Sequence, residues 1–339
     1  MQDSNSSNAL HWILGAALLL IGLFVVIALV NVRSQATIQG APTSSVTVND
    51  ADPTISNVYI GTSIQYAFSV SSITTVAGTG STVAAYVTGV VADNNGKDDI
   101  ASVMVSFHRS GNDVTCADDG SGSENALNCF KGSTDLSTCT FEIDTDLSKK
   151  FHCEFDLPHD VQPTYDNTQN SWDSQNWQAD VKVYDAEGAS AESLAAATTE
   201  VKPVLALTIP SLIDYGNHNV DYATTTTGVD MTLTQQGNDV ANVDVKATGG
   251  TGGDGTMVCT VLGNIPLANQ GWSINFSDQS FANSTKLTTS DAEANVNIPL
   301  NTVSGTDQQK DLYWTIHIPA NGVKGTCTGE DTVTAVSKS

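Results

Sequence analysis

One long apolar run stands near the start of the chain, and short alternating runs fill most of the remainder. Residues 12–30 (WILGAALLLIGLFVVIALV) are nineteen consecutive uncharged, largely apolar residues. As a helix they would span about 28 Å, close to the ~30 Å hydrocarbon core of a bilayer. Trp12 suits one membrane interface, and Arg33 follows the run on its other side. The pattern predicts a transmembrane helix over 12–30, with the lipid bilayer as its partner.

The residues that flank this run favour an uncleaved signal anchor. Residues 1–11 contain Asp3 and no Lys or Arg, whereas a cleaved signal peptide has a basic start and a shorter apolar core. We therefore expect residues 1–11 to be a cytoplasmic N-terminus. Cleavage after the small residues that end at Ala36 stays open. The layout is also similar to a type IV pilin leader, although the basic leader and the early acidic residue of such pilins are missing.

Residues 31–54 are rich in Ser, Thr and Pro and predict a flexible stalk. Beyond them, apolar and polar positions alternate in runs of strand length that are broken by turn residues. In one such run Val103, Val105 and Phe107 alternate with Ser102, Met104 and Ser106, as in a strand with one buried face. The first series of predicted strands covers 64–72, 81–93, 99–109, 139–146, 151–158, 177–188 and an Ala-rich closing run at 191–201.

A second series of alternating runs follows a boundary at Lys202-Pro203. No convincing amphipathic helix lies between the runs, which favours antiparallel sandwiches. The predicted fold class is mainly β: an N-terminal transmembrane helix followed by two immunoglobulin-like antiparallel β-sandwich domains, 55–202 and 203–339. The second series covers 204–210, 229–236, 240–248, 257–263, 273–277, 294–300, 311–319 and 330–337.

Six cysteines lie beyond residue 115, four in the first predicted domain and two in the second. An even number in an exported body indicates disulfides, and there is no CxxC or Cys/His spacing typical of zinc sites. A hairpin over 140–152 would place its flanking cysteines opposite each other. Other pairings among the first four stay open. The favoured pairs are Cys139 with Cys153, Cys116 with Cys129, and Cys259 with Cys327.

The charge beside the helix does not decide its orientation. Arg33 lies on the C-terminal side, and the positive-inside rule would on that ground place the body in the cytoplasm. One Arg is a small bias, and the paired cysteines and the Lys-poor β-rich body outweigh it. We expect a single-pass protein of the cell membrane whose C-terminal body is extracellular.

Several stretches are similar to known surface modules. VTGVVADNNGKDDIASVMVSF (87–107) and WQADVKVYDAEGASAES (177–193) match the D-x-N-G-x-x-D-I turn and the W-x-V-x-V-x-D-x-x-G ending of one module. LIDYGNHNV (212–220) and LYWTIHIPANGVKGTCTGEDTVTAV (312–336) match a second one. The chain thus resembles prokaryotic membrane-anchored cell-surface proteins built of immunoglobulin-like β-sandwich modules. The resemblance implies a spacer, an adhesin, or a pilus or surface-layer subunit.

The chain is acidic, with 13 Lys and Arg against 37 Asp and Glu and a formal charge of −24. This charge opposes binding to nucleic acid through a basic patch. Oxygen donors gather in the turn after residue 92, and the end of the run at 177–188 adds Asp185 and Glu187. Ca²⁺ prefers six to eight such ligands, whereas an ordinary turn would use them to cap its own backbone. Ca²⁺ is the one candidate cofactor, with Asp93, Asn95, Asp98, Asp99 and Asp185 as its candidate ligands.

Candidate chemistry elsewhere in the chain is sparse. Trp172 lies in a polar segment and could stack on a glycan, whereas Trp177 begins a predicted strand and is expected in the core. Signatures for a catalytic nucleophile, a zinc protease or a phosphate loop are missing, so we expect no enzyme. The favoured function is a structural or adhesive surface protein that contacts other surface proteins or copies of itself. A subunit of a surface filament or layer and a glycan- or Ca²⁺-binding module are the alternatives.

Overall fold

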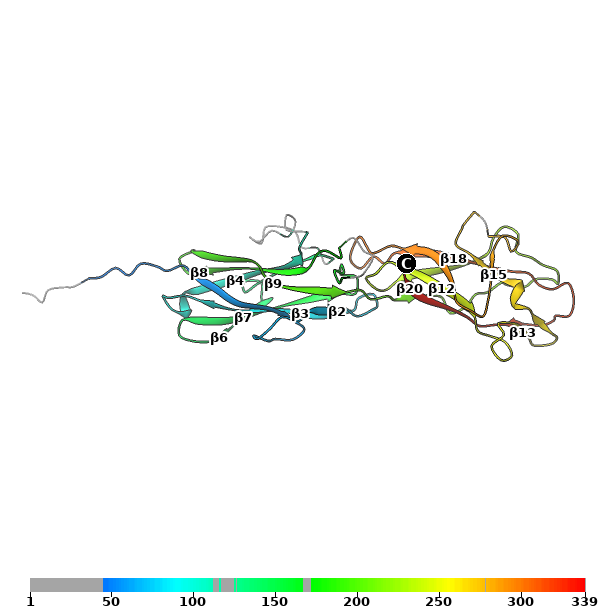
Figure 1. The fold of residues 1–339 in the computed structure, drawn as a ribbon, viewed down its shortest axis with the longest axis horizontal. Helices are drawn as coiled ribbons and strands as arrows, with labels where there is room; N and C mark the ends of the chain where they lie inside the picture. Colours follow the sequence, from blue (N-terminus) through cyan, green and yellow to red (C-terminus); the bar gives the residue numbers. More distant parts are fainter. Residues whose placement is uncertain are drawn as a thin grey trace, which may run out of the picture. The chain divides into compact units, whose positions relative to one another are not determined.

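The computed structural model describes residues 45–111, 116, 125, 127–166, 172–277 and 279–338. The chain divides into two compact units, Met1–Asn49 and Asp50–Ser339. All the described strands belong to the second unit, where they form two successive β-sandwiches (Figure 1).

The fold class predicted from the sequence requires a correction. The described part of the chain is mainly β, and it contains no helix that is both long enough and apolar enough to span a bilayer. The predicted transmembrane segment, 12–30, lies outside the described residues, as does the cytoplasmic N-terminus predicted at 1–11. The prediction rested on length and hydropathy, which measure whether a segment could cross a membrane and do not establish the fold that the chain adopts.

Two sheets form the first sandwich, and their strand order is that of immunoglobulin-like sandwiches. The short β2 (Ser72–Thr74) runs parallel to the end of β9 (Ser190–Lys202), and the 3₁₀ helix Lys97–Asp99 leads into β4 (Ile100–Arg109). One sheet has the order β1 (Thr54–Gly61), β3 (Thr82–Ala92), β7 (Ser148–Pro158) and β6 (Cys139–Ile143). The other has the order β2 (Ser72–Thr74), β9 (Ser190–Lys202), β8 (Trp177–Asp185), β4 (Ile100–Arg109) and β5 (Cys129–Ser133).

The core of the first sandwich is centred on aromatic rings from both sheets. The Phe107 ring of β4 lies 5.0 Å from the Trp177 ring of β8 and 5.7 Å from the Phe155 ring of β7, measured between centroids. The indole Nε1 of Trp177 donates a hydrogen bond of 2.9 Å to the Gln162 carbonyl, which satisfies its polar atom inside the core. Trp177 is therefore a core residue, as the alternation in the sequence predicts.

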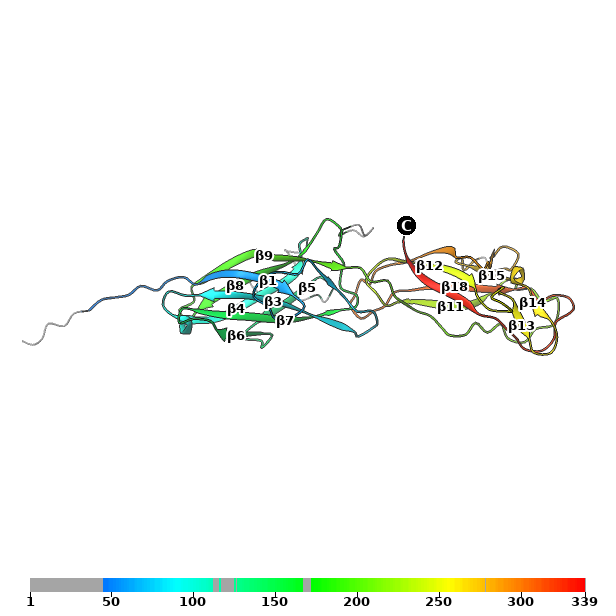
Figure 2. The ribbon, with the colours of Figure 1, turned by 60° about the horizontal axis from the view of Figure 1, so that its bottom comes forward.

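The second sandwich is built from shorter strands (Figure 2). Its core contains Trp314, Leu233 and Ile298, all fully buried. The larger sheet has the order β10 (Leu207–Thr208), β11 (Val229–Gln235), β18 (Gln309–Ile316), β15 (Gln270–Ser273) and β16 (Thr285–Lys286). Facing strands β17 (Ala292–Ile298), β12 (Ala241–Ala247) and β20 (Asp331–Ser337) form a second sheet. A small third sheet contains β14 (Asn264–Ile265), β13 (Met257–Cys259) and β19 (Cys327–Thr328), and the 3₁₀ helix Leu267–Asn269 follows β14.

The largest difference from the predicted strands lies near the start of the first sandwich. Residues 64–71 form no strand, although their apolar positions alternate, and the first strand is instead β1, which was not predicted. Ile64 and Phe68 remain exposed, so the alternation in this segment does not mark a buried face. Residues 31–44 of the predicted stalk lie outside the described residues, and the last residue of that stretch, Thr54, begins β1.

Candidate functional site

All six cysteines are paired, and no free cysteine is found. Cys139 and Cys153 are directly opposite residues of β6 and β7, and Cys259 and Cys327 are opposite residues of β13 and β19. The third disulfide joins Cys116 to Cys129 at the start of β5. In the first sandwich, Cys139–Cys153 thus joins neighbouring strands and Cys116–Cys129 closes a loop. In the second sandwich, Cys259–Cys327 closes a long loop.

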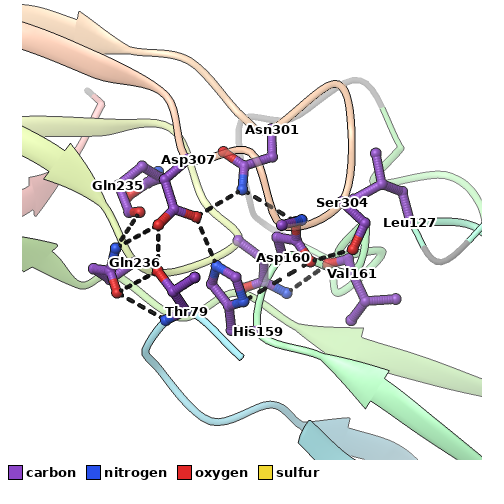
Figure 3. Close-up of polar contacts among 12 residues, drawn as sticks. Thr79, Leu127, His159, Asp160, Val161, Gln235, Gln236, Asn301, Ser304 and Asp307 are labelled. Carbon is purple, nitrogen blue, oxygen red and sulfur yellow. Dashed lines mark hydrogen bonds and ion pairs between the residues drawn. The ribbon is translucent and has the colours of Figure 1, made fainter. Parts of the chain in front are cut away.

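A buried polar cluster joins the two sandwiches at the end of β7 (Figure 3). Asp160, which follows β7, is buried, and its carboxylate accepts hydrogen bonds from three groups of the loop between β17 and β18. The donors are the Asn301 amide at 3.1 Å, the Ser304 hydroxyl at 3.2 Å and the Gly305 backbone N–H at 2.9 Å. A buried carboxylate is stable when donors satisfy its oxygens, so this loop and the end of β7 support each other.

Asp307 is the second carboxylate of this polar cluster. It accepts a hydrogen bond from His159 Nε2 at 3.1 Å and from Gln236 Nε2 at 2.7 Å, and further bonds from Thr79 and Asn301. Burial acts to raise the pKa of Asp307, but these hydrogen bonds outweigh it and lower the pKa below 3.8. The cluster therefore holds an ionised carboxylate between residues of both sandwiches at neutral pH.

A second group of carboxylates lies where the chain enters β1. Asp185 ends β8, and its Oδ1 accepts hydrogen bonds from the backbone N–H groups of Glu187 and Ala189 at 3.1 Å and 2.7 Å. Ligand oxygens of Asp50, Asp185 and Glu187 all lie within 4.8 Å of one another. Asp185 is buried, whereas Asp50 and Glu187 are exposed. We name the group formed by Asp50, Asp93, Asp99, Asp185 and Glu187 the acidic cluster.

The electrostatics show how closely these groups are packed. The pKa of Glu187 is raised, first because its side chain hydrogen-bonds to the Asp99 carboxylate and then because of the negative charge on Asp99. The pKa of Asp50 is raised by partial desolvation and by the charges of Asp185, Asp99 and Asp93. Like charges at short range disfavour ionisation of one another. The acidic cluster therefore has a strongly negative local potential.

The structure places the predicted Ca²⁺ ligands in two groups. Asp93, Asp99 and Asp185 belong to the acidic cluster. Asn95 is turned to the backbone instead, and its Oδ1 accepts the Ala51 N–H at 2.8 Å. The Asp98 side chain is 91% exposed and faces Lys97 at 3.7 Å. Sequence reasoning missed Asp50, because a residue more than forty positions before its partners carries no local spacing signal.

Trp172, the predicted glycan contact, is partly covered by the protein itself. It is half-buried, and the Arg109 guanidinium carbon lies 5.0 Å from the centroid of its ring. A cation–π contact of this kind uses a ring face that a sugar would need. The glycan role of Trp172 stays a prediction.

The shortest contact between a histidine and a carboxylate in the described chain is buried. His108 Nε2 lies 2.6 Å from Asp180 Oδ2, between β4 and β8, and the two side chains are 0% and 3% exposed. Asp180 Oδ1 also accepts the Ala195 N–H at 2.5 Å, where β9 has a left-handed residue. This pair fixes neighbouring strands of the first sandwich and has no access to a solvent-borne substrate.

The second sandwich contains a cavity of about 230 Å³ beside β20. The Tyr215 hydroxyl and Asp331 Oδ1, from residues that line it, are buried without a hydrogen-bond partner among the described residues. Burial, with a smaller contribution from the charge of Glu330, raises the pKa of Asp331 to about 6. The cavity thus contains an acid that is costly to ionise.

Comparisons with known proteins assign no family to this chain. No family model matches it, and no curated protein matches it. Among solved structures, it is similar to a chaperone–tip adhesion subunit pre-assembly complex (CsuC–CsuE) from archaic chaperone-usher Csu pili of Acinetobacter baumannii. The similarity has a TM-score of 0.29 at 14% sequence identity and covers 78% of this chain and 96% of that one. A TM-score this low supports no conclusion about fold or function.

Proposed function

We propose that this chain is a non-enzymatic structural or adhesive protein whose β-sandwich body is displayed on the outside of the cell. The observation that carries the proposal is the pairing of all six cysteines into three disulfides. Disulfides persist in oxidising compartments and at cell surfaces, whereas cytosolic thiols are kept reduced. Two sandwiches that contain three disulfides are suited to a location outside the cell.

The construction of the body supports a mechanical or adhesive role. Asp160 and Asp307 connect the two sandwiches through hydrogen bonds that are at least partly buried, so the sandwiches do not depend on a bare linker for their connection. The loops and sheet edges then serve as surfaces for other surface proteins or for copies of the same chain.

The non-enzymatic role is part of the proposal, and the burial of one acid–base pair is in keeping with it. His108 and Asp180, the closest histidine–carboxylate pair among the described residues, are enclosed between strands, whereas catalysis requires a base within reach of its substrate. The buried pair instead stabilises the packing of β4, β8 and β9.

Surface labelling of intact cells tests the location. Cells that naturally produce the protein are treated with a membrane-impermeant amine-reactive biotin ester, and the chain is recovered on streptavidin. We expect the chain to be labelled on intact cells as strongly as after lysis, while a cytosolic marker is labelled only after lysis. Labelling of the chain only after lysis would contradict the proposed display.

A further inference from the structure

We propose that the acidic cluster is a divalent-cation site, and that the ion it takes is Ca²⁺. The inference goes beyond the proposed surface role, which requires no metal. The site lies at the end of the first sandwich, at the turn from β8 to β9 and at the residues that lead into β1. Its central ligands are Asp50, Asp185 and Glu187, with Asp93 and Asp99 beside them.

Two buried carboxylate oxygens in this cluster accept no hydrogen bond from the described protein. Asp93 and Asp185 are only 2% and 3% exposed. Each uses Oδ1 on the backbone, for Asn95 N–H at 2.7 Å and for Ala189 N–H at 2.7 Å. The Oδ2 atom of each is buried with no hydrogen-bond partner among the described residues. Buried carboxylate oxygens are almost always satisfied by donors or by a metal ion, so a cation is the simplest partner for them.

The spacing of the remaining ligands suits a single ion. Two oxygens on opposite sides of a Ca²⁺ ion, each at about 2.4 Å, lie about 4.8 Å apart. The ligand atoms of Asp50, Asp185 and Glu187 are all within 4.8 Å of one another, which is the range of oxygen–oxygen separations around one such ion. The hydrogen bond between Glu187 and Asp99 would be replaced by shared contact with the ion, which removes the repulsion between the two carboxylates.

No basic side chain neutralises the cluster within the described part of the chain. Lys97 instead pairs with Asp98 at 3.7 Å and with Asp146 at 4.0 Å, and Lys149 donates to the Ile100 carbonyl at 2.8 Å. The negative charge of the acidic cluster can therefore be balanced by a cation from solution. Ca²⁺ fits better than Mg²⁺, because carboxylates that come from separate turns suit the flexible coordination of Ca²⁺, whereas Mg²⁺ demands near-ideal octahedral geometry.

The site would give Ca²⁺ a structural role at the start of the first sandwich. Ala51 is already held by Asn95, and Pro53 is buried, so residues 50–53 lie against the sandwich. An ion bound by Asp50 on one side and by Asp185 and Glu187 on the other would fasten this segment to the β8–β9 turn. Binding to the folded chain alone would raise its unfolding temperature.

Calorimetric titration of the full-length chain with CaCl₂, followed by thermal unfolding, tests the site. Extracellular Ca²⁺ modules bind with dissociation constants of about 10⁻⁴–10⁻³ M, so titration to about 10 mM is sufficient. We expect one ion to bind and to raise the unfolding temperature. Asp185→Asn retains the Oδ1 acceptor for Glu187 and Ala189 but removes the ligand charge, and we expect it to weaken binding at least tenfold.

Two further variants separate a built site from diffuse attraction. Asp50 lies outside the strands, so Asp50→Asn removes one ligand without disturbing the core. This variant replaces Asp185→Asn if Asp185→Asn does not fold. Asp98→Asn removes the same charge, from the turn that contains Asp93 and Asp99, but from a side chain that faces Lys97, and it should leave the affinity unchanged. Absence of Ca²⁺ binding by the wild-type chain would overturn the proposal, as would equal weakening by Asp98→Asn and Asp50→Asn.

Discussion

In the first sandwich β3 and β7 pair along eleven residues without a shift in register, whereas the longest described strand of the second sandwich, β18, has eight. The second sandwich also divides its strands among three sheets, and several of these strands are only two or three residues long. Its disulfide links residues 68 positions apart, against 13 and 14 in the first. The first sandwich is thus held chiefly by its strand ladders, and the second depends more on a long-range cross-link.

This difference has a physical basis in chain entropy. In a continuous strand ladder, each added residue pair forms next to a pair that is already ordered, so many residues are fixed together by cross-strand pairing. Short strands separated by long loops must instead be ordered from a more open unfolded chain, and a cross-link that closes a long loop removes more of that freedom. Cys259 and Cys327 lie in β13 and β19, which are three and two residues long. The disulfide therefore stabilises a region where strand pairing contributes little.

Removal of the long-range disulfide is expected to have the largest effect. Cys259→Ala with Cys327→Ala should lower the free energy of unfolding of the second sandwich by about 4 kcal/mol, because a 68-residue loop is opened in the unfolded chain. Cys139→Ala with Cys153→Ala is the matched control in the first sandwich, with an expected loss of about 3 kcal/mol. Urea unfolding and calorimetry measure the loss of stability in both variants. A larger loss from the control pair would break the comparison.

Asp160→Ala should uncouple the two sandwiches. The change removes the charged acceptor that the Asn301, Ser304 and Gly305 donors share, which we expect to destabilise the chain by about 2–3 kcal/mol. The sandwiches should then unfold in two separate calorimetric transitions rather than together. Asp156→Ala, at an exposed position of β7, is the control and should leave the unfolding profile unchanged. An unaltered profile for Asp160→Ala would show that the cluster does not link the sandwiches.

Asp331→Asn should stabilise the second sandwich at pH 8. The folded pKa of Asp331, about 6, exceeds its ordinary value of 3.8, so the ionised form destabilises the fold above pH 6. This penalty is relieved as the pH falls from 6 towards 4, because the folded chain then binds the extra proton.

The expected gain from this substitution is about 1–2 kcal/mol at pH 8, reduced from the full shift because the side chain is partly exposed. The gain should fade near pH 4 to 5, and denaturant titrations at several pH values measure it. Asp230→Asn, at an exposed position of β11, is the matched control. A gain that is the same at pH 4.5 and pH 8 would contradict the assignment to Asp331.

Most of the sandwich architecture was predictable from alternation along the chain. The runs at 99–109 and 177–188 coincide with β4 and β8, and the Ala-rich run at 191–201 is β9. Prediction failed at 64–71, where the apolar positions alternate but Ile64 and Phe68 remain exposed and no strand forms. Pairing partners are set by tertiary contacts, so local pattern alone could not reveal β1.

The candidate cation site was predictable in part. Asp93 and Asp99 share one turn, and Asp185 comes from the end of a strand that pairs with the strand after that turn, so alternation and turn signals located them. Asp98 was included because it is adjacent in sequence, but successive side chains of the 3₁₀ turn diverge. Asp50 comes from a segment interpreted as stalk, and only the fold brings it to Asp185 and Glu187.

The most direct test of the proposed surface role is the thiol state of the chain in its native cells. Thiols are trapped with an alkylating reagent before lysis, and the intact mass of the purified chain is measured with and without prior reduction. We expect no alkylated cysteine before reduction and six after it, as required by three disulfides in an oxidising exterior. A chain that carries six alkylated thiols without reduction would place it in a reducing compartment and contradict the proposal.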